Sequence, residues 1–401
     1  MNYWFSVISC LVIWIGSGCR PAPVTSPAET PQTAAVETPS ESPAPTPPPL
    51  KIIDVGVFLP LKGEAQASGE AALNGLIVAA EEINAKGGID GQLIRLIVRD
   101  TKSQADRAGE AVQNLLEVDH VVAVVGGVSA GSDEAARMAN KLKIPMLALG
   151  STMPGIPDKE PWVFRLSSVD FFSAKVMARF SPTIEATRAI VLYDIYSPYA
   201  RNLGVAFTQH FKSGPMNVVA GESYDLTSRD FSKPLTMIKR KNPDVIYLPA
   251  PADQAAEIIK QARALGLNMP FLGTGSWDSP EFLSAAGDAA NDCYIPARYN
   301  PEPTTDSGRA FSDAYKLKHS TPPPAMAALG YDALKVLVDA IAASGGIDHE
   351  GVGDALRSVV NFSGVTGPIT FNPESLISYP ISILKAEDGK LVFLETIAPQ
   401  D

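Results

Sequence analysis

The stretch from Gly56 to Asp100 constrains the fold of this chain most, because it contains one complete strand–helix–strand unit. Residues Ile52 to Leu59 are apolar without helical periodicity, which is typical of a strand buried on both faces of a parallel sheet. From about Gln66 the apolar residues recur at helical spacing, which predicts an amphipathic helix of about five turns. Gly87 and Gly88 supply the helix stop before a second apolar run. A crossover of this length joins parallel strands, so the unit predicts an α/β fold.

The alternation of strands and helices continues along the chain in two consecutive series. The second series begins after Ser168, and each series predicts a doubly wound parallel sheet. Residues Leu50 to Asp401 are too many for one ordinary core and suit two lobes. Near the C-terminus, two apolar runs flank Glu387-Asp388-Gly389, which predicts a hairpin turn between two strands.

Several stretches match the sequence motifs of one protein family, in the same order. PLKG follows the first strand, and the long helix after it ends in INAKGG. The second series contains NPDVIYL before a helix with QARALGL, then DSPEFLSAAGDAAND, and later ALGYDALKVLVDAI. With these motifs the chain resembles the periplasmic substrate-binding proteins of branched-chain amino acid (Leu/Ile/Val-binding) ABC transporters. The resemblance covers residues Lys51 to about Leu384.

The resemblance implies a type I periplasmic binding fold of the α/β class. In this fold two doubly wound parallel-sheet lobes are joined by three hinge strands and close on a ligand like a Venus flytrap. The three crossings are expected near Ser168, Pro296 and Gly367. The expected N-terminal lobe comprises residues 51–168 and 298–366, and the expected C-terminal lobe comprises residues 169–297 and 367–401.

The N-terminus resembles a bacterial lipoprotein signal peptide over residues 1–18. It has no charged side chain, an apolar stretch from Val7 to Ile15, and small residues before Cys19, the predicted lipidated residue. It lacks an N-terminal Lys or Arg, and Gly16 stands where such signals usually have Leu. The alternative is an uncleaved membrane anchor, for which the stretch is slightly short. Either way we expect a periplasmic or cell-surface protein held at a bacterial membrane, with residues 19–50 as the lipidated cysteine and a disordered Pro/Thr-rich tether.

Composition excludes several classes of function. The net charge of −11 argues against a nucleic-acid partner. Because Cys10 lies in the signal and Cys19 carries the anchor, only Cys293 remains in the folded part and no internal disulfide is expected. The four histidines have no ligand-like spacing, so we expect no metal and no cofactor. Small solutes, and a permease and an ATPase on other chains, are the expected partners.

Ligand-binding residues of the first lobe are expected at the carboxyl ends of its parallel strands, where helix N-termini present N–H groups to an anion. Two loops lie at such ends, GGVSAGS at residues 126–132 and GSTMP at residues 150–154. The resemblance implies that both loops hold a substrate carboxylate. It aligns Thr152 with the family's carboxylate-binding threonine and Gly150 with a position that contributes backbone. Where the family has its main carboxylate serine, this chain has Ala130, with Ser129 beside it.

The predicted ligand-binding residues of the first lobe are therefore Ser129, Ala130, Gly150, Ser151 and Thr152. The alternative is that their hydroxyls only cap helices or turns.

In the second lobe, the resemblance aligns Tyr199 closely with the family's cleft tyrosine. The acid that pairs with the substrate ammonium in the family falls at Gly275. Asp278 and Glu281 lie close by as possible substitutes for that acid, with Asp278 taken as the predicted ligand residue, and Trp277 is predicted to form a stacking wall beside the ligand. The alternative for these residues is that they cap and pack a helix after a loop. The resemblance implies an amino acid or a related small carboxylate as ligand. Because the ammonium partner is missing at its usual place, the fold and the transport class carry over better than the amino-acid ligand does.

Three functions are compatible with these motifs. The main interpretation is an extracytoplasmic solute-binding lipoprotein of an ABC transporter, which is not an enzyme. A regulatory or sensor lipoprotein of the same fold, such as a cell-wall synthase activator, is the alternative. A serine hydrolase would use the G-x-S-x-G pattern around Ser129, with His319 or His349 as base. That pattern sits on the third strand with a whole second series after it, and neither histidine has a recognisable partner acid.

Overall fold

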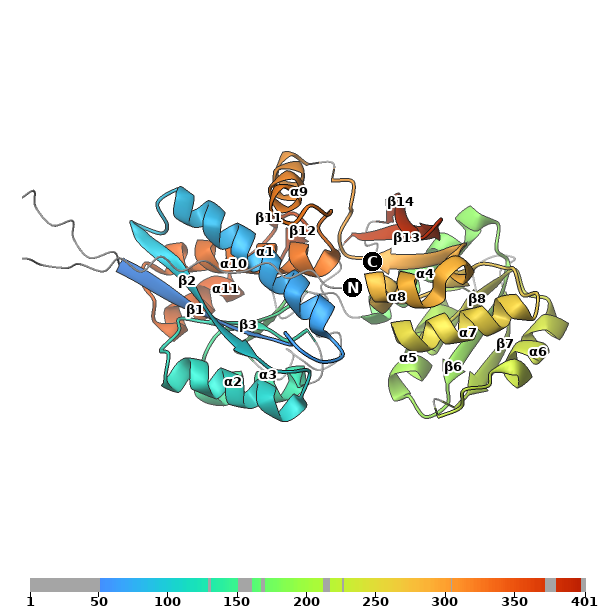
Figure 1. Cartoon of the computed structure of the whole chain (residues 1–401). Coiled ribbons are helices and arrows are strands. Elements are labelled where there is room, and N and C mark those ends of the chain that lie inside the picture. The colour runs from blue at the N-terminus through green and yellow to red at the C-terminus, as the bar shows by residue number, and fades with distance from the viewer. Residues whose placement is uncertain are drawn as a thin grey trace, which may run out of the picture. The chain divides into compact units, whose positions relative to one another are not determined.

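The computed structural model describes residues 51–128, 131–150, 161–166, 170–211, 217–225, 227–303, 305–371 and 380–397. Residues Pro49–Asp401 form one compact unit. Within it the described residues make two α/β lobes, each with its own sheet (Figure 1). The predicted signal, Cys19 and the tether lie outside the described residues.

The first sheet is entirely parallel, as predicted. Its strand order is β2-β1-β3-β4-β5. The strands are β1 (Lys51–Leu59), β2 (Gln92–Asp100), β3 (Val124–Gly126), β4 (Met146–Ala148) and β5 (Val163–Arg165). β1 pairs with β2 along its whole length, from Lys51 opposite Gln92 to Leu59 opposite Asp100. Val57 and Phe58 belong to different hydrophobic clusters, so β1 is buried on both faces.

Helices cover both faces of this sheet (Figure 1). One face carries α1 (Gln66–Ala85), α9 (Asp306–His319), α10 (Ala325–Ser344) and α11 (His349–Arg357). The other carries α2 (Ala105–Glu117) and α3 (Ser132–Leu142). α1 and α10 touch through backbone, because a Cβ on Gly75 would lie 1.8 Å from the carbonyl oxygen of Ala327 and one on Gly330 would lie 2.3 Å from that of Ala72.

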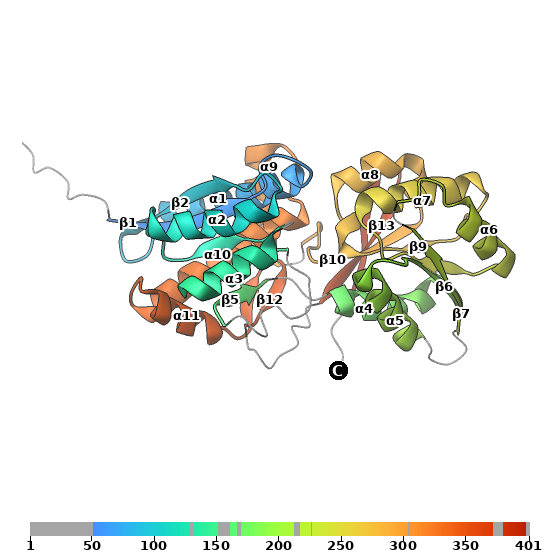
Figure 2. The same cartoon turned by 90° about the horizontal axis from the view of Figure 1, so that it is seen from below.

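The second sheet has the strand order β14-β13-β10-β9-β8-β6-β7. Its parallel part consists of β6 (Arg188–Asp194), β7 (Asn217–Tyr224), β8 (Val245–Tyr247), β9 (Phe271–Leu272) and β10 (Cys293–Ala297). Figure 2 shows α4 (Asp170–Phe180) and α5 (Pro198–Phe211) on one face, and α6 (Ser232–Lys241), α7 (Ala252–Ala264) and α8 (Pro280–Ala286) on the other. Cys293 is buried in this core.

The predicted hairpin at Glu387-Asp388-Gly389 is confirmed, and it joins β13 (Ile381–Glu387) to β14 (Lys390–Ile397). Both strands run antiparallel at the edge of the second sheet, next to β10. The second sheet therefore combines five parallel strands with the predicted hairpin as an antiparallel edge. An antiparallel pair is possible there because a tight turn can reverse the chain without a crossover helix.

The segment around the expected third crossing, near Gly367, packs on the first lobe. β12 (Gly367–Ile369) pairs with β11 (Phe362–Gly364) in a two-stranded sheet. Ile369 and Phe371 are buried in the core of the first lobe, where the Phe371 ring lies 5.5 Å from that of Phe164. The chain therefore stays with the first lobe at least to Phe371, where its apolar side chains are buried.

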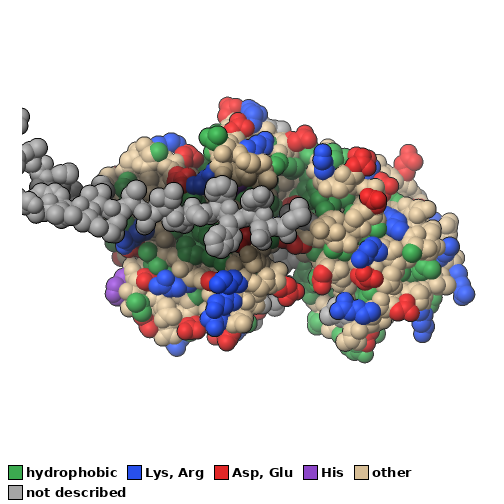
Figure 3. All heavy atoms as spheres, in the orientation of Figure 1, with side chains coloured by type: hydrophobic (Ala, Val, Ile, Leu, Met, Phe, Trp, Pro, Cys, Tyr) green, Lys and Arg blue, Asp and Glu red, His purple; other side chains and the backbone are tan. Residues whose placement is uncertain are grey.

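The described residues contain no helix long and apolar enough to cross a membrane. Within the same ranges, no three His, Cys, Asp or Glu side chains gather as a metal site would require. Acidic and basic side chains are interspersed over the face shown in Figure 3, without a large field of one sign.

Candidate functional site: the strand ends of the two sheets

The carboxyl ends of β3 and β4 bring the two predicted first-lobe loops together. The Gly150 N–H donates to the carbonyl of Gly127 at 3.0 Å, and the Leu149 N–H donates to that of Gly126 at 2.8 Å. A Cβ on Gly150 would lie 3.4 Å from the Cα of Val128. The loop after β3 and the loop after β4 are therefore in direct backbone contact at one edge of the sheet.

The loop after β3 depends on glycine at two positions. Gly127 and Gly131 have φ angles of +75° and +88°, which side-chain-bearing residues rarely adopt. Gly131 directly precedes α3, and Ser132, the first residue of that helix, is buried beside Gly127. The loop thus leads straight into a helix N-terminus, whose N–H groups and positive dipole end favour an anion.

Arg165 places a buried cation at the same edge, and it was not predicted. It is the last residue of β5, lies in register with Ala148 at the end of β4, and is 2 % exposed. A guanidinium stays charged even when buried, so Arg165 carries a positive charge at this strand end. The one signal in the sequence is that this arginine directly follows the apolar residues WVF.

Of the predicted first-lobe ligand residues, the described ranges contain Gly150. Ser129, Ala130, Ser151 and Thr152 lie outside the described residues, as does Cys19. The convergence of their hydroxyl groups on a carboxylate therefore stays a prediction. What the structure contributes is the contact between the backbones that flank them.

Tyr199 lies where the sequence predicts a second-lobe ligand residue, at a strand end. It is the second residue of α5, directly after β6, and is 37 % exposed. The connecting loop is held by Asp194, which is buried and accepts a hydrogen bond from the Tyr196 N–H at 3.0 Å. Ile195 and Tyr196 are also exposed. The end of β6 thus presents an accessible aromatic surface.

Trp277 does not form an exposed stacking wall, which corrects the prediction. Its side chain is fully buried in the core of the second lobe, stacked on Phe282 at 4.9 Å. Its indole Nε1–H donates to the carbonyl of Ala250 at 2.9 Å. Gly273 explains this placement, because a Cβ at that position would lie 2.2 Å from the indole ring. Trp277 therefore anchors the loop after β9 to the loop after β8.

Asp278 follows this anchor and is half-buried. Its N–H donates to the carbonyl of Gly275 at 3.2 Å, across the 3₁₀ turn η2 (Gly275–Trp277). Burial raises the pKa of the Asp278 carboxyl to about 7, while the charge of Arg298 acts in the opposite direction. Gly275 has room for a side chain, because a Cβ there would meet only the carbonyl oxygen of Pro296, at 3.5 Å.

The positions of the two histidines oppose a serine hydrolase. The Nε2 of His349 lies 3.1 Å from the carbonyl oxygen of Val121, which precedes β3, whereas Ser129 follows the other end of that strand. His319 ends α9, and its ring lies 4.4 Å from that of Tyr315 at an angle of 38°. Neither imidazole is held at the strand end where the nucleophile would stand.

Comparison with known proteins identifies the family. Residues 52–390 match the family model described as "Periplasmic binding protein". Among curated proteins, the chain is 27% identical over 351 residues to the Leu/Ile/Val-binding protein BraC3 of Rhizobium johnstonii. The aligned region covers 86% of this chain and 94% of that protein.

Solved structures show the same fold. The substrate-binding protein LivJ of Streptococcus pneumoniae, solved in complex with isoleucine, is 28% identical with a TM-score of 0.79, and the match covers 87% of this chain and 100% of LivJ. The leucine-binding protein LivK of Thermotoga maritima is 28% identical with a TM-score of 0.77, covering 87% of this chain and 99% of LivK. These structures confirm the predicted two-lobed α/β fold.

Proposed function

Because the chain belongs to the periplasmic binding protein family, as a substrate-binding protein of the branched-chain amino acid ABC transporter type, we propose that it captures a small carboxylate through the loops after β3 and β4. This family consists of binding proteins rather than enzymes, and they act outside the cytoplasm. The solute is then delivered to a permease and an ATPase on other chains.

The observation that carries the proposal is the backbone contact between Gly150 and Gly127. It brings two strand-to-helix loops to one edge of the sheet, beside the N-terminus of α3 and the buried Arg165. N–H groups and hydroxyls that converge at one place suit a carboxylate. We propose Ser129 and Thr152 as the hydroxyl donors, with Ala130, Gly150 and Ser151 contributing backbone.

The second lobe sets the ligand class. BraC3, LivJ and LivK bind branched-chain amino acids according to their names and titles. This chain has Gly275 at the position of the ammonium-pairing acid, and Asp278 nearby is held partly neutral by burial. We therefore propose that the ligand is a carboxylate or amide without a free α-amine, with Tyr199 as its second-lobe contact.

We also propose that Cys19 is lipidated and that residues 20–49 tether the domain to a bacterial membrane. The apolar stretch and the small residues before Cys19 support this proposal, as does the Pro- and Thr-rich composition after it. A tether of this length lets the binding domain reach a permease in the same membrane.

Calorimetry on a matched pair of ligands tests the site and its specificity together. Leucine and 4-methylpentanoate share the same apolar body and carboxylate, and only leucine carries an α-ammonium. We expect 4-methylpentanoate to bind at least about tenfold more tightly than leucine. Thr152→Ala should weaken 4-methylpentanoate about tenfold to a hundredfold, because a hydrogen bond to a charged acceptor is lost.

Two further variants complete the test. Gly275→Glu should raise leucine affinity, because its Cβ fits without strain and the new carboxylate can meet the ammonium. Thr236→Ala, which removes an exposed hydroxyl on α6, is the matched control and should change nothing. Tight leucine binding that is unaffected by Thr152→Ala would refute both the site and the specificity.

A further inference from the structure

A groove of about 700 Å³ opens on the first lobe, away from the strand ends described above. Its walls come from α1, α9, α10 and β11, with Val78 and Phe362 among the lining residues. Leu317 of α9 also lines it and is 90 % exposed. The volume falls in the range of small-molecule sites, and about half of the lining residues are apolar or aromatic. The proposed transport function makes no use of this groove.

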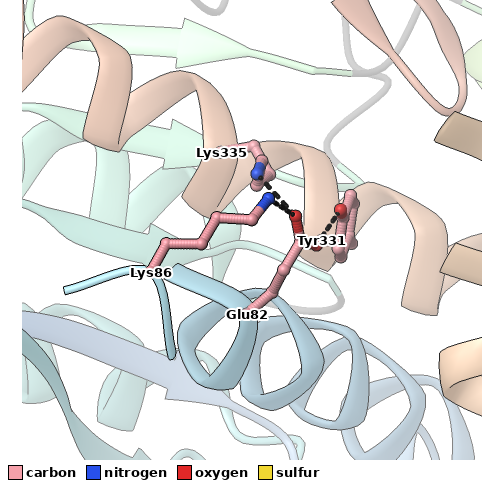
Figure 4. Close-up of polar contacts among 4 residues, drawn as sticks. All are labelled: Glu82, Lys86, Tyr331 and Lys335. Atoms are coloured by element: carbon pink, nitrogen blue, oxygen red, sulfur yellow. Dashed lines mark hydrogen bonds and ion pairs between the residues drawn. The ribbon is translucent and has the colours of Figure 1, made fainter. Parts of the chain in front are cut away.

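The polar groups of the groove gather along α1 and α10. Glu82 of α1 accepts from Lys86 at 2.7 Å and from the hydroxyl of Tyr331, and it lies 3.3 Å from the ammonium of Lys335 (Figure 4). Burial by itself would raise the pKa of Glu82, but the hydrogen bonds of Lys86 and Tyr331 and the charge of Lys335 lower it to about 2. The ionised carboxylate of Glu82 therefore interacts with two ammonium groups and one hydroxyl at the same time.

The other acidic side chains of the groove are already engaged. Glu81 pairs with Lys318. Asp332 turns its two oxygens to the β11–β12 turn, where it accepts from the N–H groups of Val365 and Thr366, each at 2.8 Å, and from the Thr366 hydroxyl. Neither carboxylate is free to take up the remaining hydrogen-bonding capacity of Lys335.

Lys335 is the group that an incoming ligand would meet. Among the described residues its ammonium has a long contact with Glu82 and lies 5.8 Å from the centre of the Tyr331 ring. An ammonium has three donors, so this one retains capacity for an acceptor. Its side chain is 28% exposed, which leaves it accessible but partly desolvated. An anion that reaches it gains more than it would at a fully exposed lysine.

We propose that this groove is a second ligand site, which binds a small amphipathic monocarboxylate with its apolar body against Leu317 and Phe362 and its carboxylate on Lys335. The groove offers an apolar wall, and beside it Lys335 keeps donor capacity while the carboxylates of the lining are engaged. A monocarboxylate combines an apolar body with one acceptor group that Lys335 can bind. A cationic amphiphile would instead bring its charge against Lys335 and Lys86.

Hexanoate is the probe. Hexylammonium and hexanamide are the comparison ligands, because they have a similar apolar chain but carry a cationic or a neutral polar group in place of the carboxylate. Calorimetry on the full chain in lipid nanodiscs, with empty nanodiscs as the blank, should show hexanoate binding at least about tenfold more tightly than either. The same titration in the Thr152→Ala chain separates this groove from the proposed transport site. Hexanoate binding should persist there, whether or not the transport-site assignment holds.

Two groove variants and one control complete the experiment. Lys335→Met should weaken hexanoate about tenfold to a hundredfold in the Thr152→Ala chain. Ala314→Phe fills the groove from an exposed helix position and should abolish binding without disturbing the fold. Lys260→Met, which removes a helical lysine paired with Glu257, should change nothing. Absence of hexanoate binding, or binding indifferent to Lys335→Met and Ala314→Phe, would overturn the proposal.

Discussion

Gly275 and Asp278 decide how much negative charge the second lobe presents after β9. Gly275 has no side chain where the resemblance implies an acid, and three residues later burial holds the pKa of the Asp278 carboxyl at about 7. The hydrogen bond from the Trp277 indole to the Ala250 carbonyl fixes this loop just before Asp278. At neutral pH the loop is therefore only partly ionised, which is a poor partner for an ammonium group.

The raised pKa of Asp278 predicts a pH-dependent stability. The pKa of this carboxyl is near 3.8 in the unfolded chain and about 7 in the native protein. At a pH between these two values, the native state holds the proton more tightly than the unfolded state does. Stability from this group is therefore lost as the pH rises through that window. Asp278→Asn should remove the dependence and stabilise the protein above pH 7 by roughly 1 to 3 kcal/mol, a value reduced because the carboxyl is only half-buried. Urea unfolding midpoints from pH 4 to pH 8 measure this, and parallel curves for both proteins would contradict it.

The pairing of α1 with α10 is the element-scale feature that shapes the first lobe. The two helices touch through backbone at Gly75 and Gly330, and about two turns beyond Gly75 they are joined by Glu82 and Lys335 instead. The close contact positions both helices on the sheet, and the side chains beyond it line the groove. A glycine is required at each contact because there is no space for a Cβ.

Gly75→Ala tests this contact. Its Cβ would lie 1.8 Å from the Ala327 carbonyl oxygen, so the helices must separate. We expect a loss of roughly 2 to 4 kcal/mol in the free energy of unfolding, despite the better helix propensity of alanine. Gly109→Ala in α2 is the matched control, because its close contact would be with the flexible side chain of Glu134, at 2.9 Å, and the nearest backbone atom lies at an ordinary 3.7 Å. Chemical denaturation compares the two, and equal stabilities would show that the contact is not tight.

At the scale of the whole molecule, the binding domain is compact from Pro49 onward, and the proposed anchor is Cys19. About thirty residues separate the two, enough in extended form to span roughly 90 Å. Membrane attachment and ligand capture should therefore be separable properties of the chain.

Cys19→Ala should abolish attachment without affecting capture. We expect the wild type in the membrane fraction and the variant released to the soluble fraction, because the thiol that carries the lipid is gone. Ligand affinity of the variant, measured by calorimetry, should equal that of the wild type. A Cys19→Ala protein that stays in the membrane fraction with unchanged electrophoretic mobility would instead favour an uncleaved anchor.

The sequence by itself determined the local elements and their order. The buried strand β1, the amphipathic helix α1 and the hairpin at Glu387-Asp388-Gly389 were predicted, because apolar periodicity and turn residues act over a few positions. The two loops at the first-sheet edge were also predicted, and the contact between Gly150 and Gly127 supports their pairing. The predicted ligand hydroxyls fall on residues outside the described ranges and stay predictions.

Only the tertiary structure decided which side chains are buried and what they meet. Trp277 packs into the second-lobe core, Phe371 stays in the first lobe, and Arg165 is buried at a strand end. The groove beside Lys335 likewise needs α1, α9, α10 and β11 together, although they are far apart in the sequence. Burial depends on contacts between distant segments, which local periodicity does not encode.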